Sequence, residues 1–273
     1  MKSADSRSSQ GDSGQYRDAT NLGARQQLYQ DFGTAVLPWQ AWVFQNLRLP
    51  AQARVLEVGS GPGRLWTENR SKLPRGWHVT LTDLSPGMLA EAELQLQAAP
   101  EFEFLRADLN HLGFLKGSFD AVIANHMLYH MPNLSVALAE VHRVLAPGGI
   151  LIAATNGPDH LRQLRQLQAA IGTLPSPRSH VEAAFNLVTG PPQMEGYFRR
   201  VTVKRHPEEL RVTDSKAVVA YLASLPGPGL SDAQVAEVGR RVDHQIELHG
   251  YWRVQVEAGV IRAHRRARIR PVL

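Results

Sequence analysis

"VLEVGSGPGRLW", residues 55–66, joins a short apolar run to a turn that contains three glycines. The apolar run has the length and composition of a buried strand, and Gly59, Gly61 and Gly63 follow it at every second position. Glycine is needed where the backbone takes a positive φ or where a ligand lies directly on it. The stretch therefore predicts a strand, a tight ligand-binding turn and the start of a helix.

Strand patterns and helix patterns alternate on both sides of this stretch. The predicted strands cover residues 54–59, 78–85, 102–109, 119–127 and 150–156, and helices are expected at 64–74, 86–99 and 133–145. Short apolar strands that alternate with helices indicate right-handed βαβ units and a mostly parallel sheet covered on both faces. The predicted fold class is therefore α/β, a three-layer Rossmann-like sandwich.

The rest of the chain is less regular. Residues 1–14 contain almost nothing that could pack, so a disordered tail is expected there. Two short helices, separated at Gly33 and Pro38, precede the first strand. We interpret residues 15–273 as a single domain, with a ligand-binding core at about 50–156 and substrate-side elements at about 157–250.

Three further patterns are predicted after the core. A strand is expected at residues 198–206, two helical segments at 214–225 and 231–248, and a last strand pattern near the C-terminus. The last pattern is interrupted at Ala258 and Gly259 in the way that a β-bulge would interrupt it.

Composition bounds the class of protein. With 273 residues, 43% of them hydrophobic, the chain can bury a full core. It has no apolar run near the ~18 residues of a membrane helix, and its start lacks the apolar core of a signal peptide, so a cytoplasmic protein with no membrane partner is expected. The lack of cysteine excludes disulfides, thiolate zinc sites and thiol nucleophiles.

The formal net charge of +5 is unevenly distributed. Part of the excess lies at the end of the chain, in Arg262, Arg265, Arg266, Arg268 and Arg270. We interpret this run as a solvated strand edge or tail, and a nucleic-acid patch is the alternative.

The residues around the glycines distinguish between possible ligands. A dinucleotide fingerprint would place a third glycine where Arg64 stands, and a phosphate-binding P-loop would end in Gly-Lys-Ser or Gly-Lys-Thr. Glu57 precedes the first glycine by two residues, and its negative charge would repel a phosphate. A ligand with a cationic part therefore fits the turn better.

Two further carboxylates are predicted at strand ends, Asp83 on the second strand and Asp108 on the third. In an open parallel sheet, ligands bind beyond the carboxyl ends of the strands. The spacing predicts a nucleoside with its ribose on Asp83, its base against Leu84 and Met88, and its exocyclic amine near Asp108.

This set of residues resembles the class I S-adenosylmethionine-dependent methyltransferases, and more narrowly the small type 11 kind. The matching pieces are "VLEVGSGPG", "LTDLSPGML", "RADL", "FDAVIANHMLYHMPN" and "EVHRVLAPGGILIAATN", which stand in the family's order within about residues 50–156. The resemblance implies a seven-stranded sheet with a reversed last strand, an N-terminal helical cover and a helical insertion before the last strand.

The resemblance also implies the cofactor, S-adenosylmethionine, with S-adenosylhomocysteine as product. The glycines would lie under the methionine part, with Glu57 shaping the turn and drawing toward the amino group, and Ala107 with Asp108 would meet the adenine edge. The implied cofactor-binding residues are Glu57, Gly59, Ser60, Gly61, Gly63, Asp83, Leu84, Met88, Ala107, Asp108, Leu109 and Asn125, with Tyr16 and Arg25 from the N-terminal cover.

A sulfonium methyl group is already electrophilic, so an in-line S_N2 transfer mainly requires a correctly placed acceptor and the exclusion of water. A general base is needed only for an acceptor that must lose a proton, and His126 and His130 are the candidates. His126 is nearer the strand end, and His130 also suits a capping or packing role. Met127 stands where a helical zinc motif would have Glu, so no metal is expected.

The sequence "NHML" at the fourth strand lacks the Asn- or Asp-Pro-Pro-aromatic motif of nucleic-acid amino methylation. We therefore expect an O, N or C atom of a small molecule as acceptor, bound by residues 174–192 and an insertion of about 207–250. Tyr197, Phe198, Tyr221 and Trp252 are candidates for its lining or for the core. Three alternatives stay open: an RNA methyltransferase that uses the basic C-terminal segment, a non-catalytic cofactor-binding regulator, and, less favoured because of Arg64, a nicotinamide oxidoreductase. The sequence indicates no oligomeric state.

Overall fold

The computed structural model describes residues 19–97, 99–173 and 183–265, with side chains from residue 26 onward. Within this part the chain forms two compact units. The sheet unit contains residues 36–160, 183–207 and 257–265, and the insert unit contains residues 19–35, 161–173 and 208–256. The interpretation of residues 15–273 as one domain stays a prediction, and the expected tail at 1–14 lies outside the described residues.

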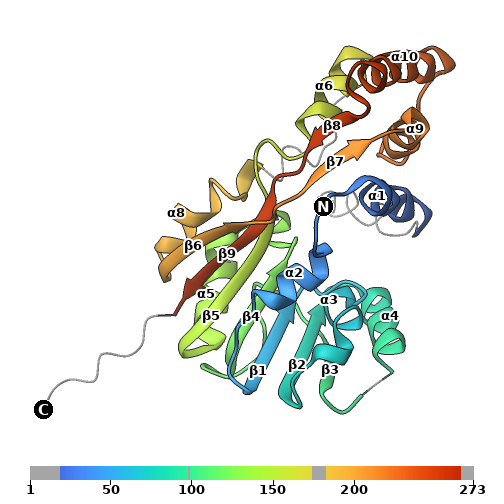
Figure 1. The fold of residues 1–273 in the computed structure, drawn as a ribbon. Helices are drawn as coiled ribbons and strands as arrows, with labels where there is room; N and C mark the ends of the chain where they lie inside the picture. Colours follow the sequence, from blue (N-terminus) through green and yellow to red (C-terminus); the bar gives the residue numbers. More distant parts are fainter. Residues whose placement is uncertain (1–18, 98, 174–182, 266–273) are drawn as a thin grey trace, which may run out of the picture. The chain divides into compact units, whose positions relative to one another are not determined.

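A seven-stranded sheet forms the centre of the sheet unit (Figure 1). Its strand order is β3-β2-β1-β4-β5-β9-β6. Neighbouring strands pair in parallel from β3 to β5, whereas β9 is antiparallel to both β5 and β6. The predicted fold class, a mostly parallel seven-stranded sheet with a reversed last strand, is confirmed. The strands are β1 (Gln52–Val58), β2 (Gly76–Asp83), β3 (Phe102–Arg106), β4 (Phe119–Asn125), β5 (Leu145–Asn156), β6 (Arg199–Arg205) and β9 (Ala258–His264).

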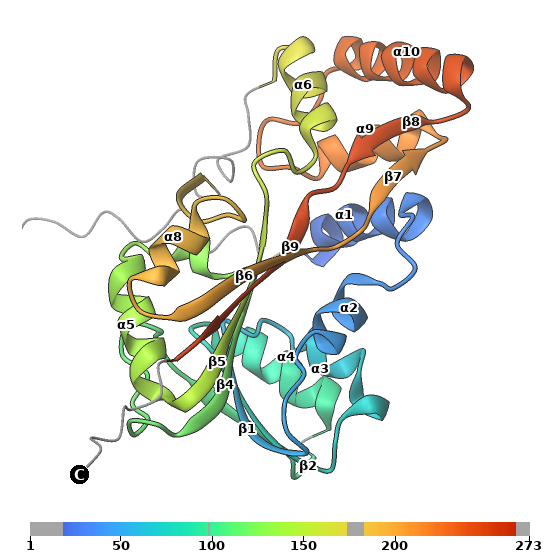
Figure 2. The ribbon, with the colours of Figure 1, turned by 60° about the vertical axis from the view of Figure 1, so that its left-hand side comes forward.

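Helices cover both faces of this sheet (Figure 2). On one face, α2 (Trp39–Gln45), α3 (Arg64–Thr67) and α4 (Pro86–Leu96) enclose an apolar core that includes Trp66 and Leu81. On the other face, α5 (Leu134–Val144) and α8 (Gly190–Glu195) enclose a second core that includes Leu56 and Phe198. The strands between them bury side chains on both sides, which explains their nearly continuous apolar runs.

One predicted helix and one predicted strand extend beyond the elements that the structure shows. The helix expected at 64–74 is the four-residue α3, followed by the 3₁₀ turn η1 (Arg70–Lys72). The Asn69 side chain donates to the carbonyls of Leu65 and Gln40, so a side-chain amide binds the last turn of α3 and ties it to α2. The strand expected at 119–127 ends at Asn125, and a second 3₁₀ turn, η2 (Leu128–His130), follows it.

The insert unit combines helices with a small sheet. It contains α1 (Ala19–Phe32), α6 (Arg162–Ala170), α9 (Ser215–Ala223) and α10 (Asp232–His249), and an antiparallel pair of strands, β7 (Glu209–Val212) and β8 (Trp252–Gln255). The predicted insertion before the last strand contains the helices α9 and α10, and it also contains the short strand β7. None of the helices in the described part of the chain has the length and apolarity that a membrane span requires.

The bulge predicted at Ala258 and Gly259 is wrong. The pattern breaks earlier, and its two halves are separate strands in different sheets, β8 and β9. Gly259 pairs with Arg205, and a Cβ at this glycine would lie 2.4 Å from the carbonyl oxygen of Lys204. The glycine therefore allows the close approach of β6, one of the reasons for which strands contain glycine.

Candidate functional site

The glycine turn connects β1 to α3, and its three glycines all have positive φ, 61° at Gly59, 54° at Gly61 and 72° at Gly63. A Cβ at Gly59 would lie 2.9 Å from the Cβ of Met127, and one at Gly63 would lie 3.2 to 3.3 Å from core side chains. A Cβ at Gly61 would have no heavy atom within 4 Å. Gly59 and Gly63 are therefore required by packing, whereas Gly61 leaves bare backbone on which a ligand can lie.

Asp83 ties this turn to the end of β2. One carboxylate oxygen accepts a hydrogen bond from the Gly61 amide at 2.9 Å, and the other accepts one from the Ser85 amide at 2.9 Å. The Ser60 amide also donates to the carbonyl of Thr82, at 3.0 Å. A carboxylate has about four acceptor positions, so Asp83 keeps capacity for two hydroxyl groups of a ligand.

The residues after Asp83 present an apolar surface beside it. Leu84 is 58% exposed, and its carbonyl accepts a hydrogen bond from the guanidinium of Arg106. Ser85 caps α4 by accepting from the amide of Met88, whose side chain is half-buried. The structure therefore brings Leu84 and Met88 to the start of α4, next to the carboxylate, as the nucleoside prediction requires.

Asp108 lies in the turn after β3 and is exposed. One of its oxygens accepts from the main-chain and side-chain amides of Asn110, so half of the carboxylate caps its own turn. Ala107 is half-buried against the core, and Leu109 is only 4% exposed and belongs to it. The side chain of Leu109 is thus buried in the α5-side core, away from solvent.

Glu57 lies beneath the turn and is 2% exposed. Its carboxyl accepts a hydrogen bond of 2.5 Å from the indole of Trp66. Burial raises the pKa of Glu57 to about 8, the Trp66 hydrogen bond opposes this rise, and the negative charge of Asp83 adds to it. The carboxyl is therefore mostly neutral at pH 7 in the free protein, which weakens our sequence argument that its charge would repel a phosphate.

Asn125 and His126 lie at the end of β4, as predicted. The Asn125 side chain accepts from the indole of Trp39 at 3.4 Å and donates to the side chain of Gln40 at 3.2 Å. His126 has a φ of 56°, an uncommon value for a non-glycine residue, and its amide donates to the carbonyl of Ala154. The side chain of Met127, the next residue, lies against Gly59, so the chain just after β4 adjoins the glycine turn.

The two histidine candidates have different surroundings. The ring of His126 lies 5.0 Å from the ring of Trp39. His130 ends η2, and its ring lies 4.5 Å from that of Tyr129, which is buried. The rings of both histidines lie near that of Tyr129, at 6.4 Å for His126, and His126 also lies against Trp39 of α2.

The sequence did not predict that the aromatic residues of α2, Trp39 and Trp42, would lie near the end of β4. Trp39 stacks on Trp42 at 5.6 Å, and His206, at the end of β6, lies 5.5 Å from Trp39 and 4.9 Å from Trp42. His206 is buried, and its ring contacts the carbonyl of Leu37 at 2.9 Å. The spacing of three between Trp39 and Trp42 indicated one helix face, but no pattern in the sequence pairs that face with residues beyond position 120.

The other predicted residues lie outside the described side chains, in the core of the sheet unit or in the insert unit. Tyr16 lies outside the described residues, as do residues 174–182 of the predicted acceptor segment, and Arg25 belongs to α1 but its side chain is not described. Phe198 is 1% exposed and belongs to the core, and Tyr197 packs against it. Tyr221 on α9 and Trp252 on β8 belong to the insert unit.

The interpretation of the C-terminal arginines as a solvated strand edge or tail is wrong for two of them. Arg265 is 7% exposed, and its guanidinium donates to the carbonyl of Leu145. Arg262 is half-buried on β9, a strand with neighbours on both sides, and donates to the carbonyls of Asn46 and Leu47. The other three arginines of the run lie beyond the described residues.

The sequence of this chain matches a known family and several curated proteins. The family model of a methyltransferase domain matches residues 56–153. The malonyl-[acyl-carrier protein] O-methyltransferase of Enterobacter lignolyticus is 41% identical over 133 residues, which cover 47% of this chain and 49% of that protein. The protein of the same name from Laribacter hongkongensis is 41% identical over 129 residues, 44% of this chain and 43% of that protein. The chain spans about half the length of the curated relatives it matches.

Solved structures share the fold at lower identity. Phosphoethanolamine N-methyltransferase 2 of Haemonchus contortus, in complex with phosphomonomethylethanolamine and S-adenosylhomocysteine, matches with a TM-score of 0.57 at 17% identity, over 93% of this chain and 59% of that chain. The YcgJ protein of Bacillus subtilis matches with a TM-score of 0.55 at 16% identity, over 83% and 97%. The family model covers the glycine turn, both strand-end carboxylates and the end of β4, so residues 56–153 of this chain are similar to a methyltransferase domain.

Proposed function

We propose that this chain is an S-adenosylmethionine-dependent methyltransferase that moves a methyl group to an O, N or C atom of a small-molecule acceptor. The observation that carries the proposal is the hydrogen bond between Asp83 and the bare backbone at Gly61, within a domain of the methyltransferase family. When bound, S-adenosylmethionine supplies a methyl group on a sulfonium, which an acceptor can attack directly.

The residues of the turn and the strand ends fit this ligand. Gly61 offers open backbone for the methionine part, and Asp83 has acceptor positions for the two ribose hydroxyls. Leu84 and Met88 offer apolar surface for the base, and Asp108 offers its second carboxylate oxygen to an exocyclic amine. We propose these residues as the cofactor site.

The acceptor side is formed by the end of β4 and the aromatic residues of α2. A direct transfer needs a fixed acceptor and little water. Trp39 holds Asn125 by a hydrogen bond and lies against His126, so both strand-end side chains have a restricted orientation. We propose that Asn125 and His126 orient the acceptor, and that His126 takes a proton where the acceptor has one to lose.

The names of the two curated relatives, from Enterobacter lignolyticus and Laribacter hongkongensis, suggest which acceptor class to test first. Both are named for O-methylation of malonyl-[acyl-carrier protein]. We propose, as the first acceptor to test, a carboxylate of an acyl group that is attached to a carrier protein. A carboxylate is already deprotonated at neutral pH, so this acceptor needs no general base.

Incubation of the purified chain with labelled S-adenosylmethionine and malonyl-acyl carrier protein tests this acceptor, and an extract of the source cells tests others. We expect formation of S-adenosylhomocysteine and a labelled product that mass spectrometry identifies. Asp83→Ala should strongly reduce the label. Failure of the chain to bind the cofactor would overturn the proposal, binding without turnover on any acceptor would favour a regulator, and label in RNA would favour the RNA alternative.

The role of His126 has its own test. With a carboxylate acceptor, His126→Gln should lower kcat without removing a pH-dependent limb from the kcat profile, because the histidine then only positions. Loss of such a limb would identify a base.

A further inference from the structure

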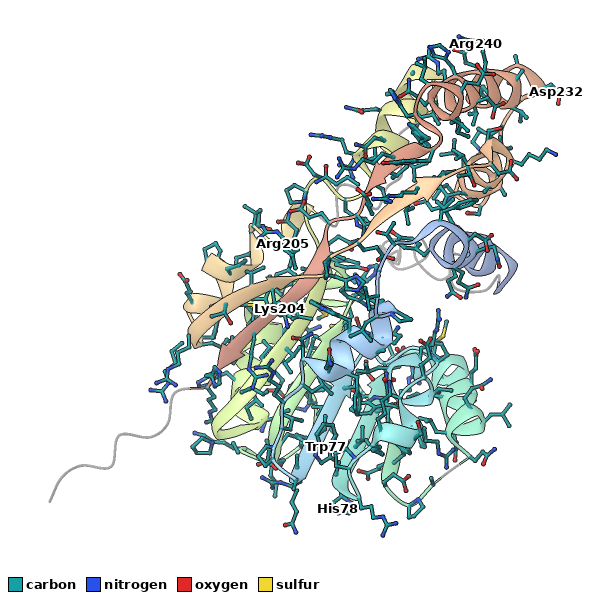
Figure 3. All side chains as sticks on the ribbon, viewed as in Figure 1. Trp77, His78, Lys204, Arg205, Asp232 and Arg240 are labelled. Carbon is teal, nitrogen blue, oxygen red and sulfur yellow. The ribbon has the colours of Figure 1, made fainter. Side chains whose placement is uncertain are left out.

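Cationic side chains gather along the free edge of the seven-stranded sheet. β6 is the edge strand, and in its antiparallel pairing with β9, Arg199 lies opposite His264, Thr202 opposite Arg262, and Lys204 opposite Val260. Residues opposite each other in an antiparallel pair share one face of the sheet. We define the basic edge face as Arg48, Arg199, Arg200, Lys204, Arg262 and His264; Figure 3 labels Lys204 on β6.

This face is the one covered by α2. The Lys204 ammonium donates to the side chain of Asn46 at 2.7 Å and lies 5.8 Å from the ring of Trp42. Arg262 donates to the carbonyls of Asn46 and Leu47, at the carboxyl end of α2, where a helix carries partial negative charge. Arg48 follows directly and is exposed. The cations of two strands and one helix end therefore lie together.

Carboxylates do not neutralise these cations. Among the residues that the structure describes, none of the six forms an ion pair with Asp or Glu, whereas Arg205, the next residue on β6, pairs with Glu257. Burial lowers the pKa values of Arg262 and His264, and repulsion adds to this: Arg48 lowers that of Arg262 further, and Arg262, Arg200 and Arg199 lower that of His264 further. A group of like charges is destabilising on its own, and an anionic partner would relieve it.

Protection of the sheet edge does not explain the whole group. Lysine and arginine on an edge strand prevent pairing with another chain, which accounts for Arg199 and Lys204. Arg262 lies on β9, an interior strand, and Arg48 follows a helix. The need to prevent edge-strand pairing therefore does not explain Arg262 and Arg48.

The dimensions of the face favour a macromolecule. Arg199 and Lys204 lie opposite His264 and Val260, four residues apart on β9, so the face is about 13 Å long at ~3.3 Å per residue, more than one phosphate or carboxylate covers. None of the aromatic side chains that the structure describes is exposed, and single-stranded nucleic acids bind to exposed aromatic rings. An acidic protein surface fits these features better than RNA does.

The register places the face near the proposed methyl-transfer site. Asn125 pairs with Ala154, Ala154 with Val260, and Val260 with Lys204, so these residues form one row across four strands. Strands lie about 4.8 Å apart, so the row from Asn125 to Lys204 is about 14 Å long. Both side chains contact α2, so they lie on the same face of the sheet.

We propose that the basic edge face docks an acidic carrier protein, which presents the methyl acceptor on a tethered arm beside the end of β4. This inference rests on the proposed function, because it names the partner that brings the acceptor to that site. The docking itself needs no catalysis, and the two proposals can therefore fail separately.

A matched pair of charge reversals tests the docking. The variant Arg199→Glu/Lys204→Glu changes two exposed cations of the face, and Lys72→Glu/Arg75→Glu makes the same change of net charge at exposed residues elsewhere in the sheet unit. The probe is holo-acyl carrier protein, measured by fluorescence anisotropy with the full-length chain at low and high salt. We expect the first variant to bind at least tenfold more weakly at low salt, the control to bind normally, and high salt to remove the difference.

Turnover gives a second, independent measurement. With malonyl-acyl carrier protein, KM should rise for the face variant only, and with malonyl-pantetheine, which lacks the protein, both variants should match the parent. If both variants bind the carrier protein equally well, the docking proposal is overturned. It is also overturned if the face variant loses binding to duplex RNA but keeps binding to the carrier protein. Self-association of the face variant with normal carrier binding would assign these cations to edge protection. Carrier binding without methylation would contradict the proposed acceptor and leave the docking supported.

Discussion

Asp83 has two structural tasks at one position. Its oxygens hold the amides of Gly61 and Ser85, so it fixes the glycine turn and the start of α4 while it faces the proposed ribose site. We predict that Asp83→Ala raises the Kd for S-adenosylmethionine at least tenfold, because both the ribose acceptors and the turn are lost. Isothermal titration calorimetry measures this. Asp120→Ala, which removes a carboxylate that pairs with Arg54 at the start of β4, serves as control. Equal affinities of the parent and Asp83→Ala would refute the cofactor site.

The raised pKa of Glu57 makes the free energy of unfolding depend on pH, with lower stability at higher pH. Its pKa is about 8 in the folded protein and 4.5 in the unfolded chain, so between these values the folded state binds the extra proton. Stability that comes from Glu57 is therefore present below pH 4.5 and is lost as the pH rises toward 8. At about 1.4 kcal/mol per pKa unit, the loss is of the order of a few kcal/mol.

We predict that Glu57→Gln flattens this dependence, because a neutral amide keeps an acceptor for the Trp66 indole and carries no charge. Urea unfolding at pH 5, 7 and 9 measures it, with the free energy of unfolding of the parent falling more steeply than that of the variant. Parallel curves for the two proteins would show that the Glu57 carboxyl does not titrate in this range.

At the scale of elements, two glycines of the same βα turn have different proposed roles: Gly63 is needed for packing, and Gly61 is proposed to bind the ligand. Gly61 and Gly63 both have positive φ, so alanine at either costs about 1 to 2 kcal/mol of backbone strain. Only at Gly63 does the added methyl also press on Leu81, Ala92 and Leu96. We predict a larger fall in Tm for Gly63→Ala and a larger loss of S-adenosylmethionine affinity for Gly61→Ala. The reverse order in either measurement would contradict the assignment of Gly61 to the ligand.

The core elements could be predicted from sequence because their causes are local. The glycine turn, Asp83 and Asp108 at their strand ends, and a helix that begins at Pro86 all follow from residues within one βα unit. The contribution of α2 could not be predicted in this way. Its Trp39 bonds to Asn125, 86 residues away, and an apolar helix face does not specify which strand end it will cover. Gly259 was misread for a similar reason, since the residue of β6 that approaches it closely, Lys204, stands 55 residues earlier in the chain.

At the scale of the whole molecule, the structure explains why the sequence pattern loosens after residue 156. Three separate segments, residues 19–35, 161–173 and 208–256, form the insert unit, whose buried residues include Leu28, Leu164 and Val242. The sheet unit has its own cores on both faces of the sheet. Periodicity indicated the insert helices one by one, but their assembly depends on contacts between distant segments, which a local pattern does not contain.

The proposed cofactor site lies in one of the two units, so we predict that the cofactor product stabilises that unit more than the other. A ligand at 100 times its Kd stabilises the state that binds it by about 2.7 kcal/mol. The proposed cofactor residues with described side chains all lie in the sheet unit, so S-adenosylhomocysteine should slow hydrogen exchange in β1, β2, α4 and β4. Exchange in α9 and α10, which belong to the insert unit, should change little. Mass spectrometry of peptic fragments measures this, with Asp83→Ala as the control that shows weaker protection at the same ligand concentration. Equal slowing in both sets of peptides would mean that the units open together and that the division into two units has no thermodynamic counterpart.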